Sequence, residues 1–358
     1  MSQSFEIVSR HDIGQEHWDY FVDSSDEAWL WHRFDLQDAL STWPGRRDLS
    51  FAVLDRDSGG KIVAVVPLHL IERRLARFFS WNVLDSLGGA ACSNNLGMKY
   101  KKKIIECVYA QCLTFARQHD VLEINLALSP MAPAYRGEGC PWVNPLLHMG
   151  CENTLTQTYV IDLKKPEGDI WSGMYKHCRT HVRKAEKEGC IVREADAFLD
   201  IGRYYEMHCE TYHRTGAIPH PFVYFKQIWE KFSCKGYSRF FLAECDGKLV
   251  AADNEVFYKG AVCGWTAAGC QRALEIGANN LLHWYAIRFA QKNGYEWYES
   301  GEGFPNVRTG KLKGLNDFKE SFGGKLVPYY RGRIITRPKV RVFAQFYRAL
   351  RRKEGMLA

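Results

Sequence analysis

The sequence pattern of one supersecondary unit occurs twice in this chain, and this duplication restricts the possible folds more than any other feature. Each copy has an apolar strand, a polar turn and a second apolar strand, a pattern typical of a β-hairpin. A helical pattern follows, runs into a Phe-Ala pair and gives way to another strand. The first copy covers Phe51–Leu126 and the second covers Phe241–Glu299. The sequence therefore predicts two similar domains with a ligand-binding cleft between them.

Length and composition agree with two domains. A chain of 358 residues exceeds what one hydrophobic core usually serves, and 46% hydrophobic residues are ample for two cores. The amino terminus has no signal-peptide pattern, and no apolar run reaches the roughly 18 residues of a membrane span. The 12 cysteines are scattered without a CxxC pair, which indicates buried free thiols in a reducing compartment. We therefore expect a folded, monomeric protein of the cytoplasm.

The basic character of the chain belongs to its last part. Residues 320–358 contain ten Lys or Arg and two Glu, whereas the whole chain has a net charge of +7. Apolar residues at positions 343, 346, 347 and 350 have the spacing of one helix face. Such a basic amphipathic helix either lies on an anionic membrane, touches RNA phosphates or docks on its own protein. Peripheral contact with the inner face of the membrane is therefore one expectation for residues 325–358.

A helix with a basic face is predicted between the two copies, from Ile170 to Glu188, with a natural stop at Gly189. Its buried stripe consists of Met174, Cys178, Val182 and Ala185. A neighbouring face carries Lys176, Arg179, Arg183 and Lys187 at steps of three and four residues. That face is either a binding site for a phosphate or diphosphate, or a solvated surface.

Several common kinds of site have no support in the sequence. His177 and His181 have the spacing of a helical zinc pair, but a metalloprotease pattern and a third ligand are missing, so no metal is expected. The chain has neither the GxSxG elbow of serine hydrolases nor the GxxxxGK loop of P-loop ATPases.

The strongest local signal follows the second copy, where residues 314–324 read Gly-Leu-Asn-Asp-Phe-Lys-Glu-Ser-Phe-Gly-Gly. The chain here resembles the FemAB family of aminoacyl and acyl transferases, including its BioF2-like acetyltransferase branch. In that family such a motif closes the second of two GNAT-like domains. Residues 179–189, 212–216 and 241–251 also stand in the family's order. The resemblance covers residues 165–330, and the first domain follows from the internal repeat. It implies an α/β (α+β) protein of two tandem GNAT-like domains, the acyl-CoA N-acyltransferase fold, with mixed central sheets flanked by helices.

The resemblance also implies a reaction, in which an acceptor amine attacks an activated carbonyl and forms an amide. The family's Phe-Lys pair falls on Phe318 and Lys319. A fixed cation at Lys319, held by the packing of Phe318, would stabilise the oxyanion of the tetrahedral intermediate or bind a phosphate of the donor. The alternative is an exposed lysine on a loop.

Acceptor binding is expected to fall on other residues. Cell-wall members of the family use an acceptor with a diphosphate, which would suit Arg179, Arg183 and Lys184. A further family segment contains His213 and Arg214. His213 is a candidate to take the proton from the amine, because the usual pKa of histidine is near neutral pH. A structural role for this histidine, with the base supplied by the ligands or by water, is equally open.

Two acidic residues, Asp253 and Glu255, alternate about Asn254 on the strand after the second hairpin turn. Because side chains on a strand alternate between its two faces, both carboxyl groups lie on one face. They either face the binding cleft together or lie on the polar side of the strand.

The donor is either aminoacyl-tRNA or acyl-CoA. No tightly bound cofactor is expected. Acetyltransferases of the GNAT type bind the coenzyme A diphosphate with a loop in which Gly follows an initial Gln or Arg by three residues. Here Leu274 stands where Gly should follow Gln271. This degenerate loop and the basic tail favour aminoacyl-tRNA as donor over acyl-CoA.

These features combine into one hypothesis with two alternatives. We expect a first GNAT-like domain at 1–160, a second at 161–324, and a basic segment at 325–358 that packs back on the first domain or stands apart. The hypothesis is transfer from aminoacyl-tRNA to an amine of a cell-wall, polysaccharide or peptide precursor. The alternatives are an acyl-CoA dependent N-acyltransferase of polysaccharide or lipid biosynthesis, and a noncatalytic protein that binds nucleic acid or membranes.

Overall fold

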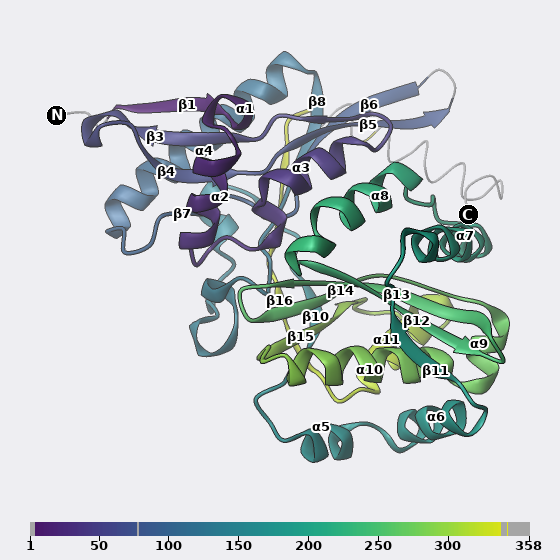
Figure 1. The fold of residues 1–358 in the computed structure, drawn as a ribbon. Helices are drawn as coiled ribbons and strands as arrows, with labels where there is room; N and C mark the ends of the chain where they lie inside the picture. Colours follow the sequence, from purple (N-terminus) through teal and green to yellow (C-terminus); the bar gives the residue numbers. More distant parts are fainter. Residues whose placement is uncertain (1–3, 77–78, 338–341, 343–358) are drawn as a thin grey trace. The chain divides into compact units, whose positions relative to one another are not determined.

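The computed structural model describes residues 4–76, 79–337 and 342. The chain divides into two compact units (Figure 1). Unit 1 takes the described residues up to Leu155 and from Tyr330 onward, and unit 2 takes Thr156–Tyr329. The basic helix predicted from the sequence near positions 340–353 lies outside the described residues.

Unit 1 contains two sheets and four α-helices among the residues that the structure describes. The first sheet has the order β1 (Phe5–Ser9), β3 (Phe51–Asp55), β4 (Lys61–Val66) and β7 (Ala91–Cys92). The second has the order β2 (Arg46–Asp48), β5 (His69–Ala76), β6 (Phe79–Ser86), β8 (Val121–Ala127), β17 (Arg331–Ile335) and β9 (Glu152–Asn153). The helices are α1 (Arg10–Ile13), α2 (Gln15–Ser24), α3 (Phe34–Ser41) and α4 (Met98–Gln118). Among the described strands of unit 1, β6 and β8 are the one pair that runs in parallel.

Unit 2 is built on one mixed sheet of seven strands. Its order is β11 (Ile191–Glu194), β12 (Ser238–Cys245), β13 (Lys248–Tyr258), β14 (Ala261–Gly269), β15 (Trp297–Gly303), β10 (Thr156–Asp162) and β16 (Lys325–Tyr329). The helices are α5 (Glu167–Gly173), α6 (Lys176–Lys187), α7 (Phe198–Thr215), α8 (Phe222–Lys231), α9 (Gln271–Ile276), α10 (Ala278–Lys292) and α11 (Lys311–Glu320).

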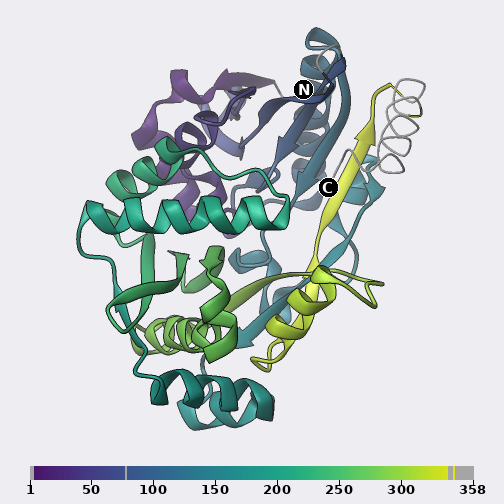
Figure 2. The same cartoon turned by 90° about the vertical axis from the view of Figure 1, so that its right-hand side faces the viewer.

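Helices cover both faces of this sheet. Figures 1 and 2 show α10 on one face with α6 beyond it, and α7 and α8 on the opposite face. The main core of unit 2 lies between the sheet, α10 and α6. It contains the stripe Met174, Cys178, Val182 and Ala185, so the predicted buried face of that helix is confirmed.

The internal repeat is present in the structure. The β3–β4 hairpin of unit 1 corresponds to the β12–β13 hairpin of unit 2, and α4 corresponds to α10. Each long helix leads into a strand, β8 or β15, that pairs in parallel with an earlier strand of its unit. Both copies therefore have a hairpin, then a long helix, then a parallel strand, as the sequence predicted. The elements between hairpin and helix differ, with β5, β6 and β7 in unit 1 and β14 and α9 in unit 2.

The continuous helix expected from Ile170 to Glu188 is wrong, because α5 ends at Gly173 and α6 begins at Lys176. Met174 and Tyr175 between them are extended. The Tyr175 N–H donates to the Ser321 carbonyl at 2.8 Å. A Cβ on Gly323 would lie 2.5 Å from the Gly173 carbonyl oxygen. Contacts with residues 321–323, distant in sequence, therefore fix the break.

No helix in the described part of the chain is both long enough and apolar enough to cross a lipid bilayer.

Candidate active site

The sheet of unit 2 opens between its two central parallel strands. β14 and β15 pair at Ala261–Trp297, Val262–Tyr298 and Cys263–Glu299, and the pairing ends there. Both strands continue on their outer sides, β14 beside β13 to Gly269 and β15 beside β10 to Gly303. Beyond Cys263 and Glu299 the two strands therefore no longer pair with each other. We use the name strand opening for the space between the two strands from Gly264 of β14 and Ser300 of β15 onward.

β-Bulges accompany this opening on both strands. Trp265 is the extra residue of β14 opposite β13, and Ser300 is the extra residue of β15 opposite β10. A bulge bends its strand and re-aims the neighbouring side chains, which is why bulges are frequent beside active sites. Ser300 is therefore the first residue of β15 past the last parallel pair, at the mouth of the strand opening.

Lys319 lies along β15 at this point. It projects from the last turn of α11, and its Nζ donates to the Glu302 carbonyl at 2.7 Å. A Cβ on Gly301 would lie only 3.2 Å from Nζ, so the absence of a side chain at position 301 leaves room for the amine. Burial lowers the pKa of Lys319, while the nearby carboxylates of Glu299 and Glu302 act in the opposite direction. Lys319 is thus a half-buried amine on a helix, and the alternative of an exposed loop lysine is wrong.

Phe318 fixes α11 against α10. Its ring centroid lies 5.7 Å from that of His283 and 5.1 Å from that of Phe322. Phe322 in turn packs on His283 at 4.4 Å and is fully buried. These aromatic contacts fix the last turn of α11 relative to α10, and Lys319 lies in that turn.

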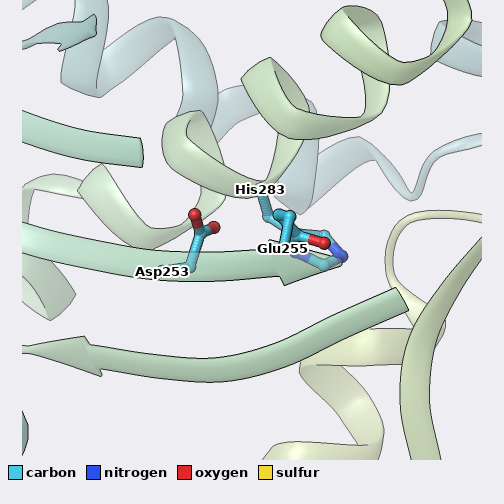
Figure 3. A group of neighbouring side chains, drawn as sticks. All are labelled: Asp253, Glu255 and His283. Carbon is cyan, nitrogen blue, oxygen red and sulfur yellow. The ribbon is translucent and has the colours of Figure 1, made fainter. Parts of the chain in front are cut away.

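A polar network occupies the core beneath α10. Asp253 and Glu255 are 4% and 1% exposed, and both project from the same side of β13 toward His283 of α10 (Figure 3). The Tyr298 hydroxyl donates to Glu255 Oε1 at 2.7 Å and lies 3.3 Å from His283 Nδ1. His283 Nε2 lies 3.2 Å from Ser300 Oγ. The two carboxyl groups share one face of β13, as expected. That face points into the core, so the alternative that they lie on a polar, solvated side of the strand is wrong.

Burial determines the charge of this network. It raises the pKa of Glu255 to about 8, and it holds the pKa of Asp253 well above its usual value, with the neighbouring Glu255 adding to the effect. Burial and the charge of Lys319 lower the pKa of His283 to about 3. Near neutral pH the imidazole is therefore neutral and the carboxyl groups are largely protonated.

Donor atoms of Asp253, Glu255 and His283 lie within 4.8 Å of one another, close enough to share a cation. However, each ring nitrogen of His283 already has a hydroxyl partner, Tyr298 on one side and Ser300 on the other. This arrangement favours a hydrogen-bonded network over a metal site. His177 and His181, the pair with zinc-like spacing, stack edge to face at 6.3 Å on the exposed side of α6.

The cations expected to bind a diphosphate, Arg179, Arg183 and Lys184, also have contacts within unit 2. Arg179 Nη1 donates to the carbonyls of Ser172 and Met174 at 2.6 and 2.8 Å, at the end of α5. The Arg183 guanidinium lies 5.4 Å from the centre of the Trp171 ring. Lys184 Nζ donates to the Glu275 carbonyl at 2.7 Å. These contacts hold α5, α6 and α9 together.

His213 and Arg214 lie in the last turn of α7, with exposed side chains. Arg214 Nη2 donates to the carbonyl of Gly269, the last residue of β14, at 2.7 Å. Arg214 thus lies at the far end of the strand that forms one side of the opening. The structure therefore groups Phe318 and Lys319 with the core network through His283, and places Arg214 at the end of β14.

Sequence reasoning missed three members of the network: His283, Tyr298 and Ser300. A usable signal was a histidine within the apolar helix run Leu281-Leu282-His283-Trp284. Tyr298 and Ser300 are two residues apart, a spacing that places both on one face of a regular strand, but the bulge at Ser300 could not be read from the sequence.

Comparisons with known proteins agree with this architecture. Residues 172–319 match a family model described as an acetyltransferase (GNAT) domain. The structure of FemX is similar with a TM-score of 0.65 at 14% identity, covering 91% of this chain and 96% of that chain. A tandem GNAT protein from the clavulanic acid biosynthesis pathway is similar with a TM-score of 0.55 at 11% identity, covering 93% and 98%. No curated protein matches the sequence significantly.

A third similar structure is the C-terminal domain of a putative lysylphosphatidylglycerol synthetase from Agrobacterium fabrum. Its TM-score is 0.56 at 13% identity, covering 94% of this chain and 96% of that chain. Together these likenesses confirm the tandem GNAT fold and the resemblance to FemAB proteins at the level of fold. The family match further classes the chain as a transferase of acyl groups, as predicted.

Proposed function

We propose that this tandem GNAT protein moves an aminoacyl or acyl group from an activated ester or thioester onto an acceptor amine and so forms an amide. The observation that carries the proposal is the position of Lys319 beside the strand opening. An ammonium group has three N–H donors, and the Glu302 carbonyl takes one of them. Nζ also lies 5.2 Å from the centre of the Phe304 ring. In this proposal a remaining N–H binds the carbonyl oxygen of the acyl donor, which becomes an oxyanion when the amine attacks.

Aminoacyl-tRNA is the donor that we propose. A coenzyme A diphosphate needs free backbone N–H groups in a glycine-containing loop. Here Gln271–Ile276 form α9, the Gly277 N–H donates to the Ala273 carbonyl at 3.1 Å, and Leu274 replaces the expected glycine. Lys184 holds the end of this helix through the Glu275 carbonyl. An aminoacyl ester on the terminal ribose of tRNA carries no diphosphate and requires no such loop.

The acceptor in this proposal is a cell-wall, polysaccharide or peptide precursor with an amino group. Arg214 is the group that we propose for its acidic part, because only one of its five N–H donors is used by Gly269. The proposed setting is the cytoplasm, with the basic segment near the carboxyl terminus in contact with tRNA or the inner face of the membrane.

Acyl-CoA is the second candidate donor, and the match to a GNAT acetyltransferase family favours it. One assay separates the two donors. Purified protein is incubated with a pool of amines and either charged tRNA or acyl-CoA, and amide formation is followed by mass spectrometry. We expect transfer from charged tRNA that ribonuclease treatment abolishes. Transfer from acyl-CoA with release of thiol would replace the first donor by the second, and transfer from neither would refute the proposed activity.

A further inference from the structure

The buried network beneath α10 connects the strand opening to a carboxyl group in the core of unit 2. Its hydrogen bonds run in one direction. Tyr298 donates to Glu255, which fixes the phenolic oxygen as an acceptor toward His283 Nδ1. His283 Nε2 is then the acceptor for the Ser300 hydroxyl. Every hydroxyl and N–H of the series therefore points from the opening toward Glu255.

We infer that Ser300, His283, Tyr298 and Glu255 form a proton-transfer chain that takes up the proton released by the attacking amine at the strand opening. This inference rests on the proposed function, because Ser300 stands at the mouth of the opening and the adjoining Gly301 contacts Lys319. Lys319 stabilises the oxyanion on one side of the carbonyl, and the chain removes the proton on the other. Ser300 is the member that touches the substrate, and the other three act through it.

The step balances as a shuttle. The amine nitrogen forms a bond to the carbonyl carbon and loses one proton to Ser300 Oγ. The Ser300 proton passes to His283 Nε2, the Nδ1 proton passes to the Tyr298 oxygen, and the Tyr298 proton passes to the Glu255 carboxylate. When the intermediate collapses, the bond from carbon to the leaving oxygen or sulfur breaks. The leaving group then takes a proton back through the same chain, which returns all four residues to their starting state.

The surroundings of Glu255 suit this role. Asp253 on the same strand and Cys263 on β14 are buried beside it, and Tyr298 and His283 reach it from β15 and α10. The positive charge of Lys319 lowers the pKa of His283. With a pKa near 8, Glu255 gains and loses a proton close to neutral pH, which a shuttle requires. Within the described residues, neither Oε2 of Glu255 nor Oδ1 of Asp253 has a hydrogen-bond partner.

Rates against pH test the chain. We expect turnover of the native protein to rise with pH to a plateau above about pH 8, in line with the pKa of Glu255. Glu255→Gln and Tyr298→Phe should each lower kcat by about a hundredfold, remove this rise and leave KM within a factor of about two. Tyr295→Phe, which removes a hydroxyl just before β15, should keep the native profile. Variants at 255 and 298 with the native rate and profile would overturn the inference.

Infrared spectroscopy supplies a readout that needs no activity. The protonated carboxyl band that belongs to Glu255 should be present at neutral pH, disappear near pH 8, be missing from Glu255→Gln and shift in Tyr298→Phe. A second band from Asp253, whose pKa is also raised, should remain in Glu255→Gln. If Glu255 is ionised throughout pH 5–7, or if the purified protein holds a stoichiometric metal ion bound by Glu255, the chain is refuted. If the band behaves as expected but no donor supports transfer, the proposed function fails, and with it the catalytic role of an existing hydrogen-bonded chain.

Discussion

The Tyr298 hydroxyl donates a 2.7 Å hydrogen bond to Glu255 in the core of unit 2, so an ionisable carboxyl group lies where a hydrophobic contact is the norm. Burying a carboxyl group costs stability unless it is protonated or well paired. Such a group is therefore expected to show itself both in the stability of the fold and in its activity.

Stability should depend on pH through Glu255. Its folded pKa of about 8 lies above the ordinary value of 4.5, so between these limits the unfolded chain releases a proton that the folded chain keeps. This contribution to stability is complete below about pH 4.5 and falls by about 1.4 kcal/mol per pH unit until about pH 8. Glu255→Gln should remove this slope. Urea unfolding at pH 5.5 and 8 checks this, and equal pH slopes for both proteins would contradict it.

Gly301 should be needed for the position of Lys319. Its φ is +101°, and an added Cβ would lie 3.2 Å from Lys319 Nζ. Gly301→Ala should therefore lower the transfer rate by about tenfold as well as destabilise the fold by about 1–3 kcal/mol. Gly294→Ala is the matched control, because its φ is +79° and the space around its Cβ is open. Equal effects of the two variants on rate would show that Gly301 serves only the backbone.

Arg179 should matter to the fold of unit 2. Its guanidinium binds carbonyls at the end of α5, so Arg179→Gln is expected to cost about 1–2 kcal/mol of stability. Lys176→Gln, on the exposed side of the same helix, should cost almost nothing. Thermal unfolding measures the stability of each variant, and the KM for the acceptor measures whether acceptor binding has changed. A large increase in KM at unchanged stability would contradict this expectation and support the diphosphate site that the sequence suggested.

Removal of residues 339–358 should weaken tRNA binding. This segment contains six Lys or Arg and one Glu. Because phosphate contacts release counterions, the shortened protein should also show a flatter dependence of affinity on salt. Filter binding at two salt concentrations measures this, with liposome flotation in parallel for the membrane alternative. Unchanged binding to both tRNA and anionic liposomes would remove the segment from the account.

Much of the fold could be predicted because its signals are local. The hairpins and long helices follow from apolar periodicity within each segment. The break between α5 and α6 could not be predicted, since residues 321–323, far along the chain, cause it. The strand opening depends likewise on the pairing of β14 with β15, which no local pattern reveals.

The candidate site was predicted in part for the same reason. Phe318 and Lys319 came from a motif, whereas His283 resembles a core residue in an apolar helix. The burial of Asp253 and Glu255 could have been predicted from the sequence. Ala251 and Phe257 lie on the same face of β13 and are apolar, which indicates that this face points into the core. The partners that give these carboxyl groups a role come from β15 and α10, which only the tertiary fold brings together.

Lys319 is proposed to stabilise the oxyanion of amide formation, so single-turnover transfer should depend on its charge. The measurement compares native protein, Lys319→Met and Lys313→Met, each with charged tRNA and with acyl-CoA. Lys313 is a control on the same helix, where it pairs with Asp317 at the surface. We expect Lys319→Met to slow transfer by about 10²- to 10³-fold and Lys313→Met to transfer at the native rate. Native-rate transfer by a correctly folded Lys319→Met protein would contradict it.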